Sequence, residues 1–61
     1  MTFELLGYLT KAQTLSMLQQ IECEAKLPRK GRALFIASPY QSALRIIKMN
    51  ANCFQIERSL V

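Results

Sequence analysis

The chain has 61 residues, of which 51% are hydrophobic and 20% charged, and its formal net charge is +4. This length predicts a single domain, residues 1–61, and such small domains usually need disulfides, a metal or a partner subunit for stability. Two cysteines and no histidine exclude a disulfide framework and argue against a zinc site, so we expect oligomerisation. No apolar run reaches the ~20 residues of a membrane span, and the first residues lack signal-peptide features. We therefore expect a soluble cytoplasmic protein that does not contact membranes.

The first segment, Thr2–Leu9, is a short apolar run that fits either a helical turn over residues 3–8 or a strand, because periodicity does not separate the two at this length. The next four residues, Thr10–Gln13, read TKAQ. This is a capping box, in which the threonine and the glutamine each satisfy a free amide of the other's backbone. It predicts an amphipathic helix with one apolar face over residues 11–26, and Pro28 prevents the helix from continuing.

Three cations, Arg29, Lys30 and Arg32, lie within four residues of the stretch LPRKGRALF. They fit a solvated turn between two helices, or a set of phosphate contacts. The apolar run that follows fits a helical turn over 31–37 or a buried strand. Seven of the eight cations lie in residues 26–61, an asymmetry that suggests an anionic partner, although solubility alone also requires some net charge.

A second capping box, SPYQ at residues 38–41, has proline at the first helical position and predicts a long helix over residues 39–58. Its apolar residues form two stripes on different faces. The first stripe has heptad-like spacing and can pack against the first helix; it consists of Tyr40, Leu44, Ile47, Ala51 and Phe54. The second stripe lacks cover, so we expect it to form a dimer interface, unless the two short apolar segments cover it; it consists of Ile46, Met49, Cys53 and Ile56.

The predicted fold is therefore all-α. It has two main helices, at about 11–26 and 39–58, with short helical turns at 3–8 and 31–37, and it dimerises through the last helix. The alternative is an α+β fold in which the two short apolar segments are strands. That alternative is less simple, because a sheet of two strands is too small to be stable alone.

The residues offer little for catalysis. Without histidine, and with four scattered glutamates, the chain lacks the positioned acid–base pair that most enzymes use. The two cysteines have no base beside them in the sequence, and the two glycines form no phosphate-binding loop. We expect a protein that is not an enzyme, with no cofactor, no metal and no small-molecule substrate.

The stretch RALFIASPYQSALRII, residues 32–47, resembles the helix-turn-helix of the lambda-type Cro repressors, most closely at Tyr40–Ala43. The resemblance implies a recognition helix that presents side chains to base edges, while nearby cations contact phosphates. Two positions depart from the family pattern, Leu34 in the first helix and Ser38 at the turn. The implied base readers are Gln41, Ser42 and Arg45, and the implied phosphate contacts are Arg29, Lys30, Arg32 and Lys48.

As a small and basic chain that is predicted to be helical, the protein is also similar in type to the short early-region proteins of temperate lambdoid phages. This resemblance implies a role in modulating host or phage development. The function we expect is a non-enzymatic regulatory protein, a homodimeric module that binds a host or phage protein. The alternative is a DNA-binding transcriptional regulator of the helix-turn-helix type.

Overall fold

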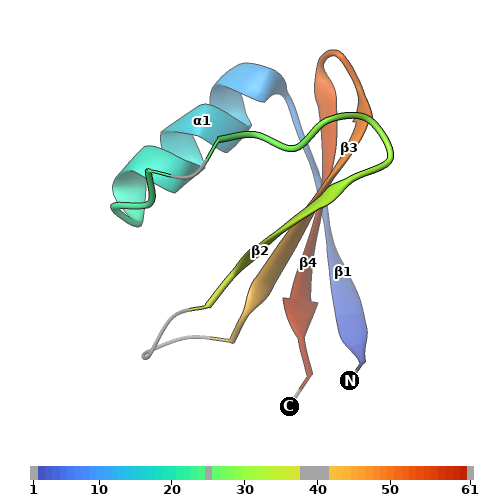
Figure 1. The fold of residues 1–61 in the computed structure, drawn as a ribbon. Helices are drawn as coiled ribbons and strands as arrows, with labels where there is room; N and C mark the ends of the chain where they lie inside the picture. Colours follow the sequence, from blue (N-terminus) through green and yellow to red (C-terminus); the bar gives the residue numbers. More distant parts are fainter. Residues whose placement is uncertain (1, 25, 38–41, 61) are drawn as a thin grey trace.

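The structure is a computed structural model, and it describes residues 2–24, 26–37 and 42–60. Within these ranges it contains one helix and four strands, and the helix covers one face of a single sheet (Figure 1). The sheet is antiparallel throughout, with the spatial order β1-β4-β3-β2. In chain order the elements are β1 (Phe3–Leu9), α1 (Lys11–Gln20), β2 (Ala33–Ile36), β3 (Leu44–Asn50) and β4 (Cys53–Ser59).

The all-α prediction is wrong, because most of the regular structure is strand. Both short segments that were ambiguous in the sequence, the one before Thr10 and the one after Arg32, are strands. The α+β alternative is therefore closer, although it did not anticipate the other two strands. A sheet of four strands with a covered apolar face no longer has the instability of a two-stranded one.

The predicted last helix is instead the hairpin of β3 and β4. In β4 the apolar residues Phe54 and Ile56 alternate with polar ones, which is the period of a strand with one buried face. Asparagines form the turn: the Asn52 amide donates to Asn50 Oδ1 at 2.9 Å, the local bond by which asparagine favours turns over helix. The two apolar stripes expected on a helix arose from these two strands.

The core lies between α1 and the sheet. Its most buried apolar side chains are Leu18, Ile46, Phe54 and Ile56, each at most 4% exposed. Ile46 and Ile56 face each other directly across β3 and β4. Around them lie partly buried apolar residues from β1, α1, β2 and the connection after α1, namely Leu9, Met17, Cys23, Leu27, Leu34 and Ile36.

This core corrects the second stripe predicted on the last helix. Ile46 and Ile56 lie at the centre of the folded chain, so they form no surface for a second copy. Cys53 is half-buried in β4, and Met49 is exposed near the end of β3. These four residues therefore form no continuous interface.

Helix α1 begins as predicted and ends earlier. The capping box at Thr10 is confirmed: Thr10 Oγ1 accepts from the Gln13 amide at 3.1 Å, and Gln13 Oε1 accepts from the Thr10 amide at 2.9 Å. The helix ends at Gln20 rather than residue 26, because the chain turns sharply at Glu22, where φ is +56°. This turn lets Cys23 and the later Leu27 pack against the core.

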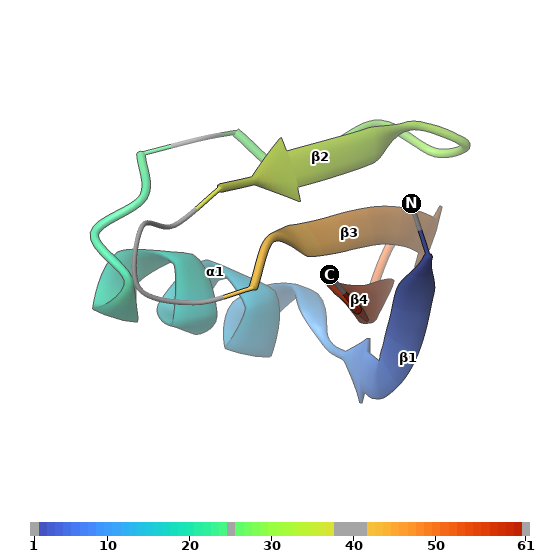
Figure 2. The same ribbon diagram turned by 90° about the horizontal axis from the view of Figure 1, so that it is seen from below.

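The two edges of the sheet bend toward each other, as the view along the strands shows (Figure 2). Edge strand β1 carries a bulge between Leu5 and Gly7, and such an irregularity increases local twist and bending. Beside β4, the ends of the described chain also meet: the Leu60 amide donates to the Thr2 carbonyl at 2.9 Å.

Candidate interaction surface

The sheet face opposite α1 is called the open face, because no described element covers it (Figure 1). Strand register assigns its side chains, since residues directly opposite each other share a face. One row runs across all four strands from Leu5 to Phe35, and a second runs from Tyr8 to Ala33. The open face consists of Phe3, Leu5, Tyr8, Ala33, Phe35, Arg45, Ile47, Gln55, Glu57 and Ser59.

An ion pair occupies the middle of the open face. Arg45 and Glu57 are direct partners across β3 and β4, and Arg45 Nε lies 2.7 Å from Glu57 Oε1. The hydrogen bond from Arg45 lowers the pKa of the Glu57 carboxyl, against a smaller opposing effect of desolvation. The same bond raises the pKa of Arg45. Both groups are therefore charged at neutral pH.

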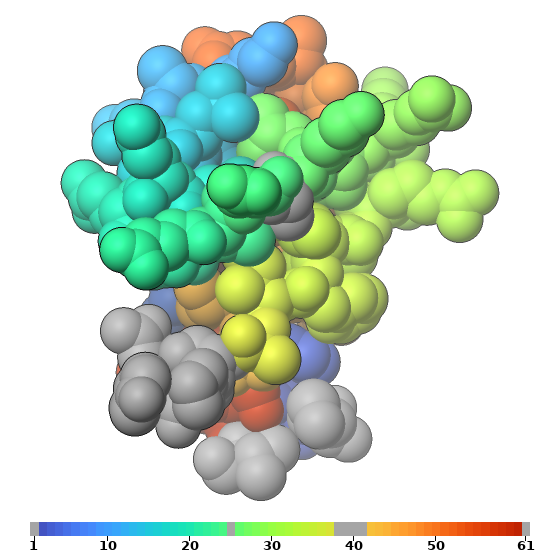
Figure 3. Space-filling view, turned by 60° about the vertical axis from the view of Figure 1, so that its left-hand side comes forward, coloured from blue at the N-terminus to red at the C-terminus, as the bar shows by residue number. Residues whose placement is uncertain are grey.

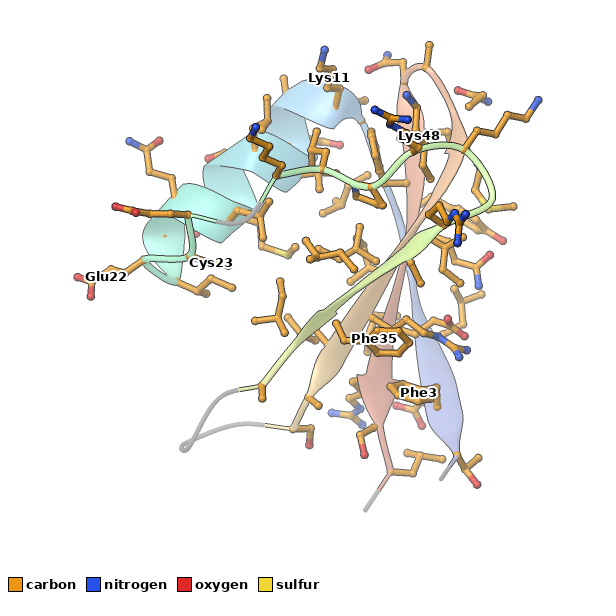
Figure 4. All side chains as sticks on the ribbon, in the orientation of Figure 1. Phe3, Lys11, Glu22, Cys23, Phe35 and Lys48 are labelled. Atoms are coloured by element: carbon orange, nitrogen blue, oxygen red, sulfur yellow. The ribbon has the colours of Figure 1, made fainter. Side chains whose placement is uncertain are left out.

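Two aromatic rings, those of Phe3 and Phe35, lie near this ion pair and contact each other. Phe3 lies on one edge strand and Phe35 on the other, yet their ring centroids are only 6.2 Å apart, at 58° (Figure 4). Three strand spacings separate these edges, about 14 Å in a flat sheet, so the rings meet because the sheet curls and the side chains lean inward. The Arg45 guanidinium lies 4.2 Å from the Phe3 ring centroid, a cation–π contact. Glu57 is only 8% exposed as a result, although it lies on the open face.

The rim of the open face is apolar and solvent-exposed. Phe35 is 62% exposed, Tyr8 56% and Leu5 50%. Single exposed apolar side chains are ordinary on soluble proteins, but a group on one face around a preorganised polar centre is typical of interaction sites. The open face is therefore the strongest candidate interaction surface among the described residues.

The structure divides the residues that were predicted to bind nucleic acid. Arg29, Lys30 and Arg32 lie in the connection between α1 and β2, and Lys48 lies near them at the end of β3. Ser42 precedes β3 and lies about 20 Å from Lys48 along the strand direction. Of the remaining two candidates, Arg45 is held in the ion pair of the open face. Gln41 lies outside the described residues.

The helix-turn-helix implied by residues 32–47 does not form where the structure describes this stretch. Its two ends are strands β2 and β3, which pair directly with each other. In Tyr40–Ala43, the part that most resembles a recognition helix, residues 40 and 41 lie outside the described residues. Without two helices, Arg45 cannot take the predicted position against a base edge.

Sequence reasoning missed the residues of the open face. The alternation Phe54-Gln55-Ile56-Glu57 was a usable signal, because it separates two faces with strand period. No comparable signal pairs Phe3 with Phe35, since 32 positions separate them and they lie on opposite edges of the sheet.

Other chemistry is limited in the part of the chain that the structure describes. It contains no group of three histidine, cysteine or acidic side chains that could hold a metal ion. Cys23 and Cys53 are both free thiols. No helix among these residues is long and apolar enough to cross a membrane. Comparisons with protein-family models, with curated proteins and with solved structures found no match.

Proposed function

We propose that this chain is a small non-enzymatic interaction module that acts as a homodimer, and that two copies pair through their open faces. The observation that carries the proposal is the exposed apolar rim of Leu5, Tyr8 and Phe35 around the central ion pair of Arg45 and Glu57. We therefore still propose the homodimer expected from the sequence, but with the open face of the sheet as its interface instead of a stripe on the last helix.

The need for a partner supports this arrangement. Among the described residues only four apolar side chains are buried, and cores this small rarely supply more than about 3–5 kcal/mol of stability. A second copy on the open face would turn the single-sided sheet into the inner layer of a sandwich, in which both faces of the sheet contribute burial.

The size of the open face fits a dimer. The molecule measures 30 by 23 Å along its two longer axes, so the open face covers at most roughly 700 Å², somewhat less than the ~800 Å² per partner of a standard interface.

The charge pattern favours a second copy over an unrelated partner. A twofold interface brings the same patch against itself, so it must be self-complementary. The open face holds one cation and one anion in its centre, Arg45 and Glu57, and is neutral there, whereas the whole chain carries +4. Two such faces therefore meet without the repulsion that other basic parts of the surface would produce.

Molar mass by light scattering at low and high micromolar concentration tests the proposal. We expect the wild-type chain to approach the mass of two copies as concentration rises, and Phe35→Glu to stay at one. The matched control is Leu15→Glu, which places the same charge at an apolar residue of comparable exposure on α1, and which should still dimerise.

A wild-type mass of one chain across the whole range would overturn the homodimer. If both variants still dimerise, the chain is a homodimer, but the open face is not its interface. Circular dichroism of each variant shows whether the fold is retained, and Phe35 is exposed enough for the charged substitution to be tolerated.

A further inference from the structure

The cations of the chain separate into two groups. Arg45 and Arg58 are paired on the sheet, with Glu57 and Glu4 respectively, at 2.7 Å each. The other six form no ion pair among the described residues. The net charge therefore originates outside the open face, and five of these six side chains gather at one end of the molecule. This set is called the basic end, and it consists of Lys11, Arg29, Lys30, Arg32 and Lys48.

Three members of the basic end lie in a single β-turn. The Arg32 amide donates to the Arg29 carbonyl at 2.9 Å, which closes the turn. Gly31 has φ +78°, as the third residue of a type II turn requires, while Lys30 has no positive φ. The ends of such a turn lie within about 7 Å of each other, so the three exposed cations are crowded. The half-buried residue Leu27 packs against the core and anchors the connection.

A fourth cation lies opposite this turn. Ala33 of β2 is the partner of Ile47 in β3, and continuing this register by one residue places Arg32 opposite Lys48. Like charges directly opposite each other destabilise an antiparallel pair. Nothing in the described part of the chain neutralises them, so the fold tolerates a local repulsion here.

The fifth cation, Lys11, is the first residue of α1 and lies at the same end of the molecule. The Lys11 amide donates to Asn52 Oδ1 at 2.9 Å, which fixes the start of the helix against the β3–β4 turn. Lys11 and Lys48 lie at the same end of the molecule, and the connection after α1 crosses this end on its way to β2 (Figure 4). In the space-filling view the connection between α1 and β2 starts near the centre and projects at the upper right (Figure 3). The free acidic side chains, Glu22 and Glu24, follow the opposite end of α1.

We propose that the basic end binds the phosphate backbone of nucleic acid, without reading its bases. Five mutually repelling cations from a helix start, a turn and a strand end are best neutralised together by a polymer with closely spaced charges. Lysine and arginine on flexible stems suit phosphate contacts, which position a chain without specifying sequence. This surface lies apart from the open face, so it does not depend on dimerisation.

Fluorescence anisotropy with the full chain tests this binding, using a short duplex DNA and a single-stranded RNA of equal length. If all five cations contact phosphates, the log–log slope of affinity against salt should be near −4.5 for the duplex and −3.5 for the single strand. Between 50 and 200 mM salt, the duplex should lose about 500-fold in affinity. Random sequences should compete equally well.

Two variants with the same change in net charge locate the site. Lys30→Gln removes one cation from the turn and should reduce the duplex slope by about 0.9. Arg58→Gln removes one cation from an exposed pair on the sheet and should leave the slope unchanged. Equal losses in both variants would mean that only net charge matters, and would overturn the site.

Two further results would also overturn the proposal. One is the absence of measurable binding to either nucleic acid at 50 mM salt. The other is tighter binding to vesicles of anionic lipid than to either polymer, because a membrane surface would then be the better partner. A strong preference for one sequence over random competitors would contradict binding through the backbone alone.

Discussion

Glu22 is the single non-glycine residue with positive φ in the described ranges. It follows the helix cap Ile21, and the surrounding bonds form a Schellman motif: the Glu22 amide donates to Gln19 at 3.1 Å, and the Cys23 amide to Leu18 at 2.9 Å. Glycine is the residue preferred at this position, because a Cβ is strained in the left-handed region. The Glu22 side chain points away from the molecule (Figure 4), so no contact compensates.

Glu22→Gly is therefore expected to stabilise the chain by about 1 kcal/mol, measured as a higher midpoint of urea unfolding with an unchanged slope. The matched control is Glu24→Gly, which removes the same charge at a residue without positive φ. That control should not stabilise the chain, since glycine there only adds freedom to the unfolded state. Equal stabilisation by both changes would point to charge, not backbone strain.

The ion pair of the open face gives stability a defined pH dependence. The pKa of Glu57 is lowered in the folded chain, mainly by the hydrogen bond from Arg45. The unfolded state therefore binds a proton more readily than the folded state, so the contribution of Glu57 is complete above the unfolded pKa and is lost as pH falls through the folded one. The relevant window lies below about pH 4.3, the ordinary glutamate value.

Glu57→Gln should remove this dependence. We expect the wild-type chain to exceed the variant in stability at neutral pH, and the difference to shrink as the pH falls below that window. Unfolding midpoints at a series of pH values measure the effect. Glu4→Gln is the control, because its pair with Arg58 is exposed and should change stability little.

Strand β3 places two isoleucines in different environments. Ile46 is fully buried beneath α1, whereas Ile47 is half-buried on the open face. Ile46→Ala should therefore cost about 2–5 kcal/mol, and Ile47→Ala should cost clearly less in the monomer. Thermal melts at low concentration compare them. Similar losses from both would contradict the assignment of the two faces.

At the scale of the elements, locally encoded features were predictable. The capping box at Thr10 needs only two residues three positions apart, and it was confirmed. The hairpin after Ala43 was missed, because the absence of glycine and proline suggested helix while the turn is made by asparagines. Helical period puts Ile47 in the seam with Leu44 and Phe54, whereas strand period assigns it to the face opposite Ile46.

For the whole molecule, the long-range arrangement was beyond sequence periodicity. The excess of cations after residue 26 was visible, but only the fold pairs Arg45 and Arg58 with acids and brings Lys11 toward Lys48. The curl that joins Phe3 to Phe35 depends on strand order and on a bulge. Such features arise from pairing between distant segments, which short patterns do not encode.

The position of β4 in the sheet affects the order in which the strands can pair during synthesis. β4 is the final strand in sequence, yet it lies between β1 and β3 and pairs with both. While the ribosome is still adding residues before Cys53, β1 has no neighbour and half of the core, Phe54 and Ile56, does not exist. β1 can therefore join the sheet only after β4 has been made, whereas β2 and β3 can pair with each other earlier.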